Sequence, residues 1–229
     1  MLTCLLLPAI GGPRDSPRSA HCANNLRNLA LALLQYHDDH GSFPPAYIAD
    51  ASGKPMHSWR VLLLPYIDQR NLYKQYRFDE PWDGPNNIAL ANATSWPSFY
   101  RCPSSNWNGE TNYFAVVGPQ TIWPGTKTTK MSDIKDGTAN TIMLVEVHNS
   151  GIHWMEPRDL DISQMSMSVN PHTGSGISSA HPGGWAHVAL ASGETRAIDH
   201  TAPPQALRAA LTIAGGEKDE LPARTRAPR

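Results

Sequence analysis

Histidines and acidic residues are the side chains of this sequence that could do chemistry, and the densest histidine group lies in its second half. The sequence has ten histidines, among them His172, His181 and His187, with His153 and His200 on either side. Zinc ligands usually occur as close pairs on a helix or hairpin, whereas these three are nine and six residues apart in sequence typical of loops. We expect exposed or locally hydrogen-bonded imidazoles, and predict neither a metal nor another cofactor.

Acidic residues also gather near Trp154, where Glu146, Glu156 and Asp159 follow one another. A buried Glu146 paired with Arg158 would be structural. An acid with a perturbed pKa in a cleft would instead indicate a functional site. The sequence favours neither interpretation.

A turn-rich segment at 79–87 (DEPWDGPNN) places Asp79, Glu80 and Asp83 around Trp82. Carboxylates in such a loop could bind calcium through their oxygens. A capped turn that packs on the indole explains the same residues. Both interpretations stay open.

Seven tryptophans are present, and Trp96, Trp107 and Trp123 fall in loops with Pro, Asn and Gly. An indole in a loop could serve as a platform for a sugar or as an interface anchor, and packing on proline-rich loops is the alternative. If the protein binds a ligand such as a glycan, the candidate binding residues are Trp82, Asp83, Trp154, Glu156, Arg158 and His181.

Catalytic motifs are missing from the sequence. Neither zinc-peptidase, phosphate-binding-loop, dinucleotide-binding nor nucleophile-elbow patterns occur. Ser178 and Ser179 stand close to His181, but catalytic serine–histidine pairs are defined in space and not by adjacency. We predict a protein that is not an enzyme, and a hydrolase built around His181 is the least favoured function.

The composition limits the partners. A formal charge of −1 without a Lys/Arg cluster in the predicted fold excludes nucleic acid, since phosphates require a basic surface. Among 229 residues, 20 Pro and 17 Gly predict a loop-rich globular chain. The apolar start Met1–Ile10 has about half of the roughly 20 residues that a membrane span needs and no basic flank. It therefore offers neither a complete anchor nor a complete export signal.

One long helix is the clearest element that could position these groups. Apolar residues at spacings of four, three, four and three form a single stripe that consists of Cys22, Leu26, Leu29, Leu33 and Tyr36. Ser19 is the expected N-cap and Gly41 the expected stop. A second helix should start at Ser58 and be kinked by Pro65.

Strands are predicted after the helices. Residues rich in β-formers occupy 113–117, 141–147, 188–191 and 195–198, and the last two flank the turn Ser192–Gly193. A short helix should follow at 203–214. Helices first and antiparallel strands later favour an α+β fold.

Ten segments carry a resemblance to a known family, in order along about residues 20–216. They are CANNLRNLALA (22–32), YH (36–37), GSFPP (41–45), HSWRVLLLPY (57–66), EPWD (80–83), YRCPS (100–104), TNY (111–113), DIKDGTANT (133–141), WMEPRDL (154–160) and HPGG (181–184). Together they resemble the large bacterial family catalogued as domain of unknown function 1559, whose members commonly begin with a prepilin-type segment. The resemblance implies a pilin-like fold, with an N-terminal helix laid on an antiparallel β-sheet, displayed outside the cytoplasmic membrane. It implies no activity.

Against this family the chain divides into three parts. Residues 1–19 correspond to a remnant of the prepilin-type apolar helix and a linker, 20–216 to the pilin-like domain, and 217–229 to a disordered tail. The family usually has a long apolar helix at its start, of which only Leu5–Ile10 resembles the end. Ala191-Ser192-Gly193-Glu194 departs from the family's usual Ala-Asp-Gly-Ser.

The three cysteines lack zinc spacing and by themselves allow one bridge and one leftover thiol. The resemblance places Cys22 and Cys102 in two matched motifs, and so predicts a disulfide between them, which requires an oxidising compartment. The implied function is a pseudopilin-like structural or assembly protein of the cell envelope, with itself or pilin-type subunits as partners. An extracytoplasmic module that binds a ligand or carbohydrate is the alternative.

Overall fold

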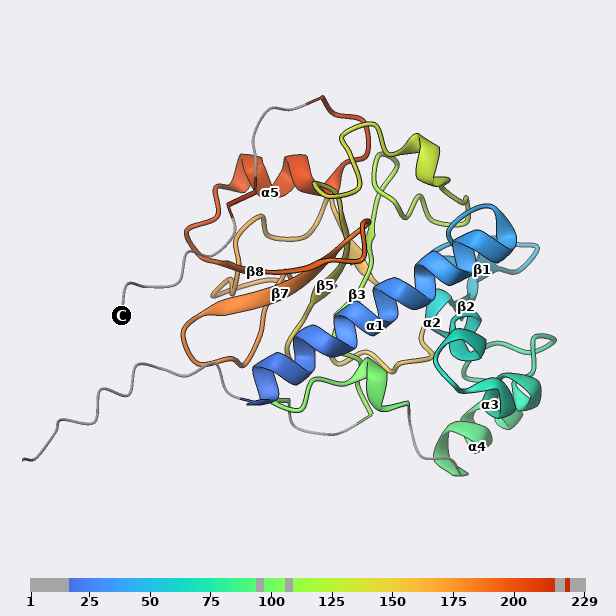
Figure 1. Cartoon of the computed structure of the whole chain (residues 1–229). Helices are drawn as coiled ribbons and strands as arrows, with labels where there is room; N and C mark the ends of the chain where they lie inside the picture. Colours follow the sequence, from blue (N-terminus) through green and yellow to red (C-terminus); the bar gives the residue numbers. More distant parts are fainter. Residues whose placement is uncertain (1–16, 94–96, 106–108, 217–220, 223–229) are drawn as a thin grey trace, which may run out of the picture.

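A four-stranded antiparallel sheet crossed by one long helix forms the centre of the protein (Figure 1). The computed structural model describes residues 17–93, 97–105, 109–216 and 221–222. The strand order is β3–β5–β7–β8, with the bounds Tyr113–Phe114 (β3), Ile142–Glu146 (β5), Trp185–Leu190 (β7) and Thr195–Asp199 (β8). This arrangement confirms the predicted α+β fold with an N-terminal helix and an antiparallel sheet.

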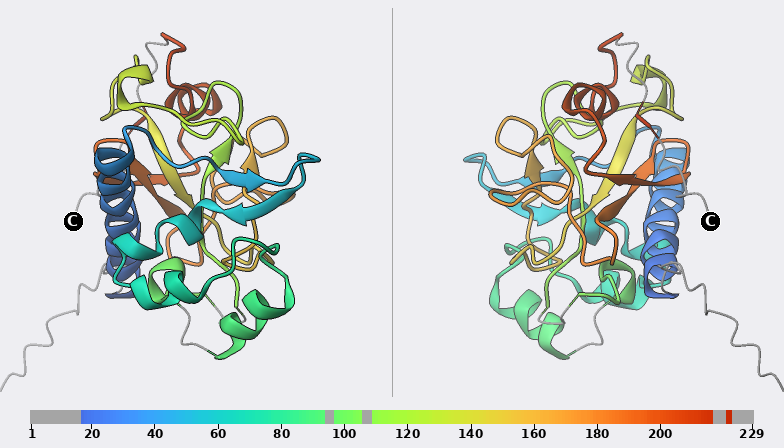
Figure 2. Two further views of the ribbon diagram at one scale, coloured as in Figure 1. Left: turned by 90° about the vertical axis from the view of Figure 1, so that its right-hand side faces the viewer. Right: turned by 90° about the vertical axis from the view of Figure 1, so that its left-hand side faces the viewer.

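Helix α1 (Pro17–His40) covers one face of that sheet, as the views in Figures 1 and 2 agree. It begins before the predicted cap Ser19, which lies inside the helix and is buried. It ends at Gly41, where a φ of +75° lets the Gly41 N–H donate to the carbonyl of His37. The side chains on its inner face are Ser19, Cys22, Asn25, Leu26, Leu29, Ala30, Ala32 and Leu33.

The sheet has a hydrophobic core on both faces. Side chains alternate between faces along a strand, so Leu144 of β5 packs in the cluster that contains α1, while its neighbour Val145 packs in a second cluster. Helix α5 (Pro204–Leu211) contributes Leu207 to that second cluster. All five residues of β5 are therefore buried.

The helix predicted from Ser58 is divided, as expected from Pro65. Ser58 is the N-cap of α2 (Trp59–Leu62), and its hydroxyl accepts from the backbone N–H of Arg60. Pro65 lies in the 3-10 helix η1 (Leu64–Tyr66), and α3 (Arg70–Gln75) follows. None of the described helices has the length and apolar character needed to cross a bilayer.

Helix α4 (Pro85–Ala93) starts inside the segment that was predicted to be a turn-rich loop. The Glu80 carboxylate explains how it starts, because Oε1 accepts from the Asn87 backbone N–H at 2.7 Å and Oε2 from the Asn86 side chain at 2.9 Å. A carboxylate is favourable at a helix N-terminus. Glu80 thus has the capping role that was the alternative to calcium.

The predicted strand 113–117 is split in two. After β3, the backbone N–H of Ala115 donates to Asp159 Oδ1 at 2.9 Å instead of continuing the ladder with β5. Strand β4 (Val116–Val117) then pairs in parallel with β6 (Leu160–Asp161), a departure from the all-antiparallel expectation. The remaining elements are the hairpin β1 (Tyr47–Ala49) with β2 (Pro55–Ser58), and the 3-10 helices η2 (Ser98–Tyr100) and η3 (Met131–Asp133).

A disulfide between Cys22 and Cys102 joins α1 to the segment after η2, which confirms the predicted pairing. The two Cα atoms are 5.1 Å apart although the residues are separated by 80 positions, and both side chains are buried. Cys4 and the predicted remnant up to residue 16 lie outside the described residues, as does most of the predicted tail. Leu221, in the short described part of that tail, is buried in the second core cluster.

Removal of this cross-link should destabilise the fold. The double substitution Cys22→Ala/Cys102→Ala frees a loop of 80 residues in the unfolded chain, and we expect it to lower the free energy of unfolding by about 4–5 kcal/mol in urea denaturation. Gln35→Ala, at an exposed position of α1, is the control and should leave stability nearly unchanged. A loss below about 1 kcal/mol for the double variant would show that the bridge does not constrain the unfolded chain as its loop length implies.

Candidate functional site

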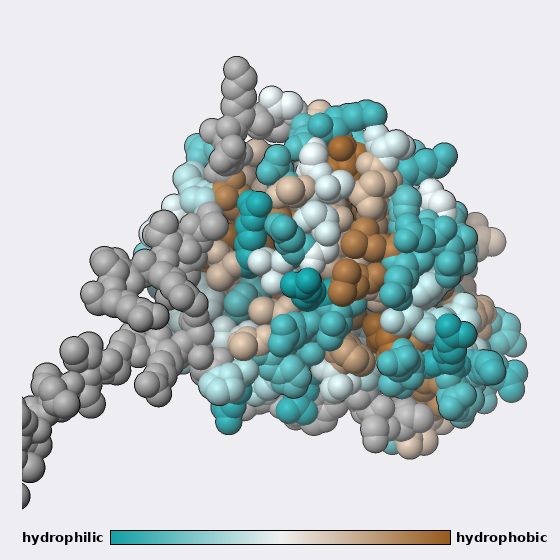
Figure 3. Space-filling view, in the orientation of Figure 1, coloured by the Kyte–Doolittle hydropathy of each residue, from teal (hydrophilic) through white to brown (hydrophobic). Residues whose placement is uncertain are grey.

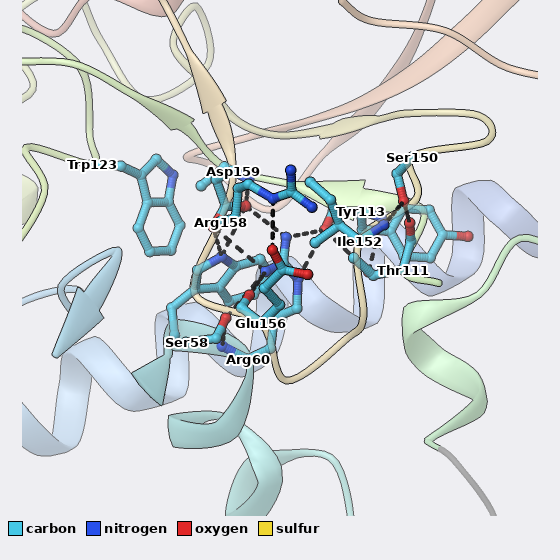
Figure 4. A network of polar contacts seen from close by, with 12 residues as sticks. Ser58, Arg60, Thr111, Tyr113, Trp123, Ser150, Ile152, Glu156, Arg158 and Asp159 are labelled. Atoms are coloured by element: carbon cyan, nitrogen blue, oxygen red, sulfur yellow. Dashed lines mark hydrogen bonds and ion pairs between the residues drawn. The ribbon is translucent and has the colours of Figure 1, made fainter. Parts of the chain in front are cut away.

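Two buried polar clusters and one partly exposed aromatic surface contain the residues of chemical interest. The first cluster, called here the arginine cluster, surrounds the fully buried guanidinium of Arg60 in α2 (Figure 4). Arg60 Nη2 lies 2.6 Å from Asp159 Oδ1, and the two side chains are 0% and 2% exposed. The Tyr113 carbonyl accepts from Arg60 Nη2 at 2.9 Å, and the Ser58 hydroxyl accepts from Nη1 at 3.1 Å.

Asp159 also accepts hydrogen bonds from several donors. Its oxygens also accept from the Trp59 indole N–H at 3.1 Å and from the Ala115 backbone N–H at 2.9 Å. Burial raises the pKa of the Asp159 carboxyl, and the Arg60 charge and these donors oppose that shift. The sequence predicted either a structural or a functional acid near Trp154. Asp159 is a perturbed acid that ties α2 to β3, held inside the protein and not in a cleft.

Arg158 lies on the surface and pairs with Glu156, with Nε 2.6 Å from Oε1 and exposed fractions of 59% and 20% (Figure 4). The suggested pairing of Arg158 with Glu146 is wrong. Glu146 is the last residue of a strand that is buried throughout, and its carboxylate contacts His181 inside the protein. A partly exposed pair such as Glu156–Arg158 contributes little stability.

The aromatic surface consists of Trp82, His153 and the Glu156–Arg158 pair. The half-buried Trp82 stacks on His153 with 5.5 Å between ring centroids, and the backbone N–H of Glu156 donates to the His153 carbonyl. Burial lowers the pKa of His153 to about 4. His153 is therefore a neutral aromatic ring at neutral pH.

The other predicted binding residues are placed as follows. Trp154 is buried against Tyr100, with ring centroids 5.7 Å apart, so it supports the aromatic surface from inside. Asp83 is exposed next to Trp82 in the chain. Trp123 is buried in the core, whereas Trp96 and Trp107 lie outside the described residues.

The second cluster, called here the histidine cluster, lies between α1 and the sheet. His181 Nε2 is 3.0 Å from Glu146 Oε1, and both side chains are buried. The backbone N–H of His187 donates to Glu146 Oε2 at 3.0 Å, and His187 Nε2 lies 2.9 Å from the Ser19 hydroxyl of α1. The imidazoles of His181 and His187 are 5.3 Å apart.

The expectation of exposed or locally hydrogen-bonded imidazoles is therefore wrong for His181 and His187, which are buried against residues far away in the sequence, whereas His172 and His200 are exposed. Strand β7 is buried throughout, and His187 follows it into the interior. His181 is thus brought together with Glu146 and not with the other predicted binding residues. The sequence held no signal for this pairing, since the two residues are brought together only by the packing of β5 and β7.

The disulfide completes the histidine cluster. Cys102 Sγ is 3.9 Å from His181 Nε2. The Tyr113 hydroxyl donates to the Cys22 carbonyl at 3.3 Å, and burial, with the Glu146 charge, raises the pKa of Tyr113 well above its usual value. The phenol therefore stays a donor at physiological pH.

The fold and these clusters define an α+β protein whose N-terminal helix packs on an antiparallel sheet, contacts it through buried polar groups, and is tied by a disulfide to the segment after η2. The chain belongs to the DUF1559 family of proteins of unknown function (SBP_bac_10), whose family model matches residues 12–128, just over half of the chain. The match includes Arg60, Cys22 and Cys102. Comparisons with curated proteins and with solved structures give no significant match.

We expect the free energy of unfolding to depend strongly on the arginine cluster. Arg60→Met leaves the Asp159 carboxylate buried without its cation, and we expect a loss of about 3–5 kcal/mol in the free energy of unfolding. The double variant Arg60→Met/Asp159→Leu should recover much of that loss, because no unpaired charge remains. Arg158→Met is the control and should cost at most about 1 kcal/mol. If Arg60→Met proved as mild as Arg158→Met in urea denaturation, the buried pair would not have this role.

Proposed function

We propose that the protein is a pseudopilin-like structural or assembly subunit of the cell envelope, which acts outside the cytoplasmic membrane and does not catalyse a reaction. The observation that carries the proposal is the placement of α1. This 24-residue helix packs on the sheet by its inner face and is tied by a disulfide to the segment after η2. Its outer face is left to the surroundings along the length of the domain (Figure 1).

The outer face of α1 has a central stripe of polar residues without Asp, Glu, Lys or Arg and with one exposed apolar side chain. Exposed residues recur at spacings of three and four, which places them on one stripe that consists of His21, Asn24, Asn28, Leu31 and Gln35. Leu31 is 42% exposed, an unusual fraction for a large apolar side chain in this protein. On the face that carries α1, Figure 3 shows separate apolar groups set among hydrophilic ones.

The disulfide supports the proposed location. Stable disulfides form in oxidising compartments outside the cytoplasm, and the Cys22–Cys102 bridge is fully buried between α1 and the segment after η2. A bridge of this kind is expected of a protein that folds after export. Membership of the DUF1559 family is consistent with this location.

The pairing of the buried ionisable groups with one another supports a role without catalysis. Arg60 with Asp159, and Glu146 with His181, each form a buried pair between elements of the fold. Each pair fastens one part of the chain to another. These groups therefore fit a rigid assembly unit better than an enzyme that must expose an acid or base to a substrate.

Binding of a glycan or another small ligand is the second candidate, and the aromatic surface favours it. Trp82 is partly exposed and lies on the neutral ring of His153, and the partly exposed Glu156–Arg158 pair follows His153 in the chain. A flat indole beside polar groups that can donate and accept hydrogen bonds suits a sugar ring.

Site-specific photo-crosslinking in the native cell tests the assembly role. A photoreactive residue at Asn28 or Leu31, in the middle of the outer stripe, should produce adducts with a second copy of the chain or with another pilin-like subunit. The matched control is Ser52, which is exposed in the β1–β2 hairpin away from α1 and should give far weaker adducts. Equal labelling from both sites, or no adduct from the stripe, would contradict the proposal.

A further inference from the structure

Two cysteines, a histidine and a glutamate meet at one buried point of the histidine cluster. We propose that, once the Cys22–Cys102 disulfide is reduced, these four side chains bind a single zinc-like divalent cation, so that the same point holds either a disulfide or a metal. The inference does not depend on the proposed assembly function.

The distances allow such a site. One ligand atom from each of Cys22, Cys102, Glu146 and His181 lies within 4.8 Å of all the others. Zn–S bonds of about 2.3 Å and Zn–N bonds of about 2.0–2.1 Å in a tetrahedron put ligand atoms roughly 3.3–3.8 Å apart. Cys102 Sγ and His181 Nε2 are already 3.9 Å apart, and His181 Nε2 and Glu146 Oε1 are 3.0 Å apart. Small movements of the side chains would bring the four ligand atoms to the distances of a tetrahedral site.

The four ligands come from separate parts of the fold, and this is why their sequence spacing does not resemble a zinc motif. Each is held by the protein around it. The backbone N–H of His187 holds Glu146 Oε2, which leaves Oε1 directed at His181. The Cys102 backbone N–H donates to the Asn112 side chain at 2.8 Å. Such outer contacts orient the ligands of metal sites.

His181 also has binding capacity that the protein does not use. Its Nδ1 is buried and has no hydrogen-bond partner among the described residues. A buried polar atom without a partner is rare and points to a missing ligand or ion. His181 Nε2 is the nitrogen that lies near Glu146 Oε1 and Cys102 Sγ, so it would bind the cation together with them, and Nδ1 would carry the imidazole proton.

Charge explains why the site depends on redox state. A dithiol reductant converts the disulfide to two thiols and is itself oxidised to a disulfide. The divalent cation then displaces the two thiol protons and neutralises the two thiolates. A disulfide oxidant that takes up two electrons restores the bridge and removes both thiolate ligands, so oxidation releases the metal.

Cobalt titration of the full chain tests the proposal, in a Cys4→Ser background that removes the third thiol. The protein is reduced in denaturant, refolded without oxygen and titrated with Co²⁺. We expect one cobalt per chain with thiolate-to-cobalt absorption, and none in the oxidised protein. His181→Phe and Glu146→Gln should each weaken binding at least about tenfold, whereas His172→Ala, an exposed control, should not change it.

Two results would overturn the proposal. The first is a reduced, folded chain without the cobalt spectrum. The second is unchanged affinity in His181→Phe, which would mean that the cysteines alone hold the ion. If circular dichroism shows that the reduced chain is unfolded without metal, zinc should restore the native spectrum, because binding then supplies folding free energy. Failure of zinc to do so counts equally against the site.

Discussion

The contact between α1 and the sheet through the histidine cluster is the constraint on which the rest of the structure depends. The Cys22–Cys102 bridge and the contact of Ser19 with His187 fix the N-terminal half of the helix in position. With that half fixed, the inner face of α1 covers Leu144 and the other apolar side chains on that face of the sheet. Burial of this apolar surface is the main source of stability. Because the histidine cluster fixes the position of α1, it determines which apolar side chains are buried.

The arginine cluster fixes a second part of the fold, next to β3. Its buried ion pair joins α2 to the segment around Asp159 and interrupts the ladder at Ala115, so that β4 turns away to pair with β6. A buried ion pair seldom adds net stability over apolar residues of the same size. Its effect here is geometric, since the Arg60 guanidinium finds these carbonyl and carboxylate acceptors in one arrangement of the chain.

The parts of the fold that depend on local spacing were predictable. The stripe on α1, the stop at Gly41 and the turn at Ser192–Gly193 follow from periodicity and from residues that adopt positive φ. The disulfide followed from the family resemblance. Helix α4 was missed because Pro85 after a glycine is typical both of a turn and of a helix start.

The candidate site was predictable only in part, because it is built from tertiary contacts. Trp82, Glu156 and Arg158 were selected and lie at or beside one surface, but Glu146 was given the wrong partner. Its true partner His181 comes from a loop that no local pattern places next to β5. Side chains brought together by sheet packing leave no periodic signal in the sequence.

Hydrogen exchange measured by mass spectrometry on the oxidised protein tests the central claim most directly. If α1 is locked to the sheet, backbone amides between Leu26 and Leu33 should exchange as slowly as those of β5 and β7, through global unfolding alone. Exchange of the α1 amides far faster than that of the strands, with the disulfide intact, would show that the helix opens on its own and would contradict the account.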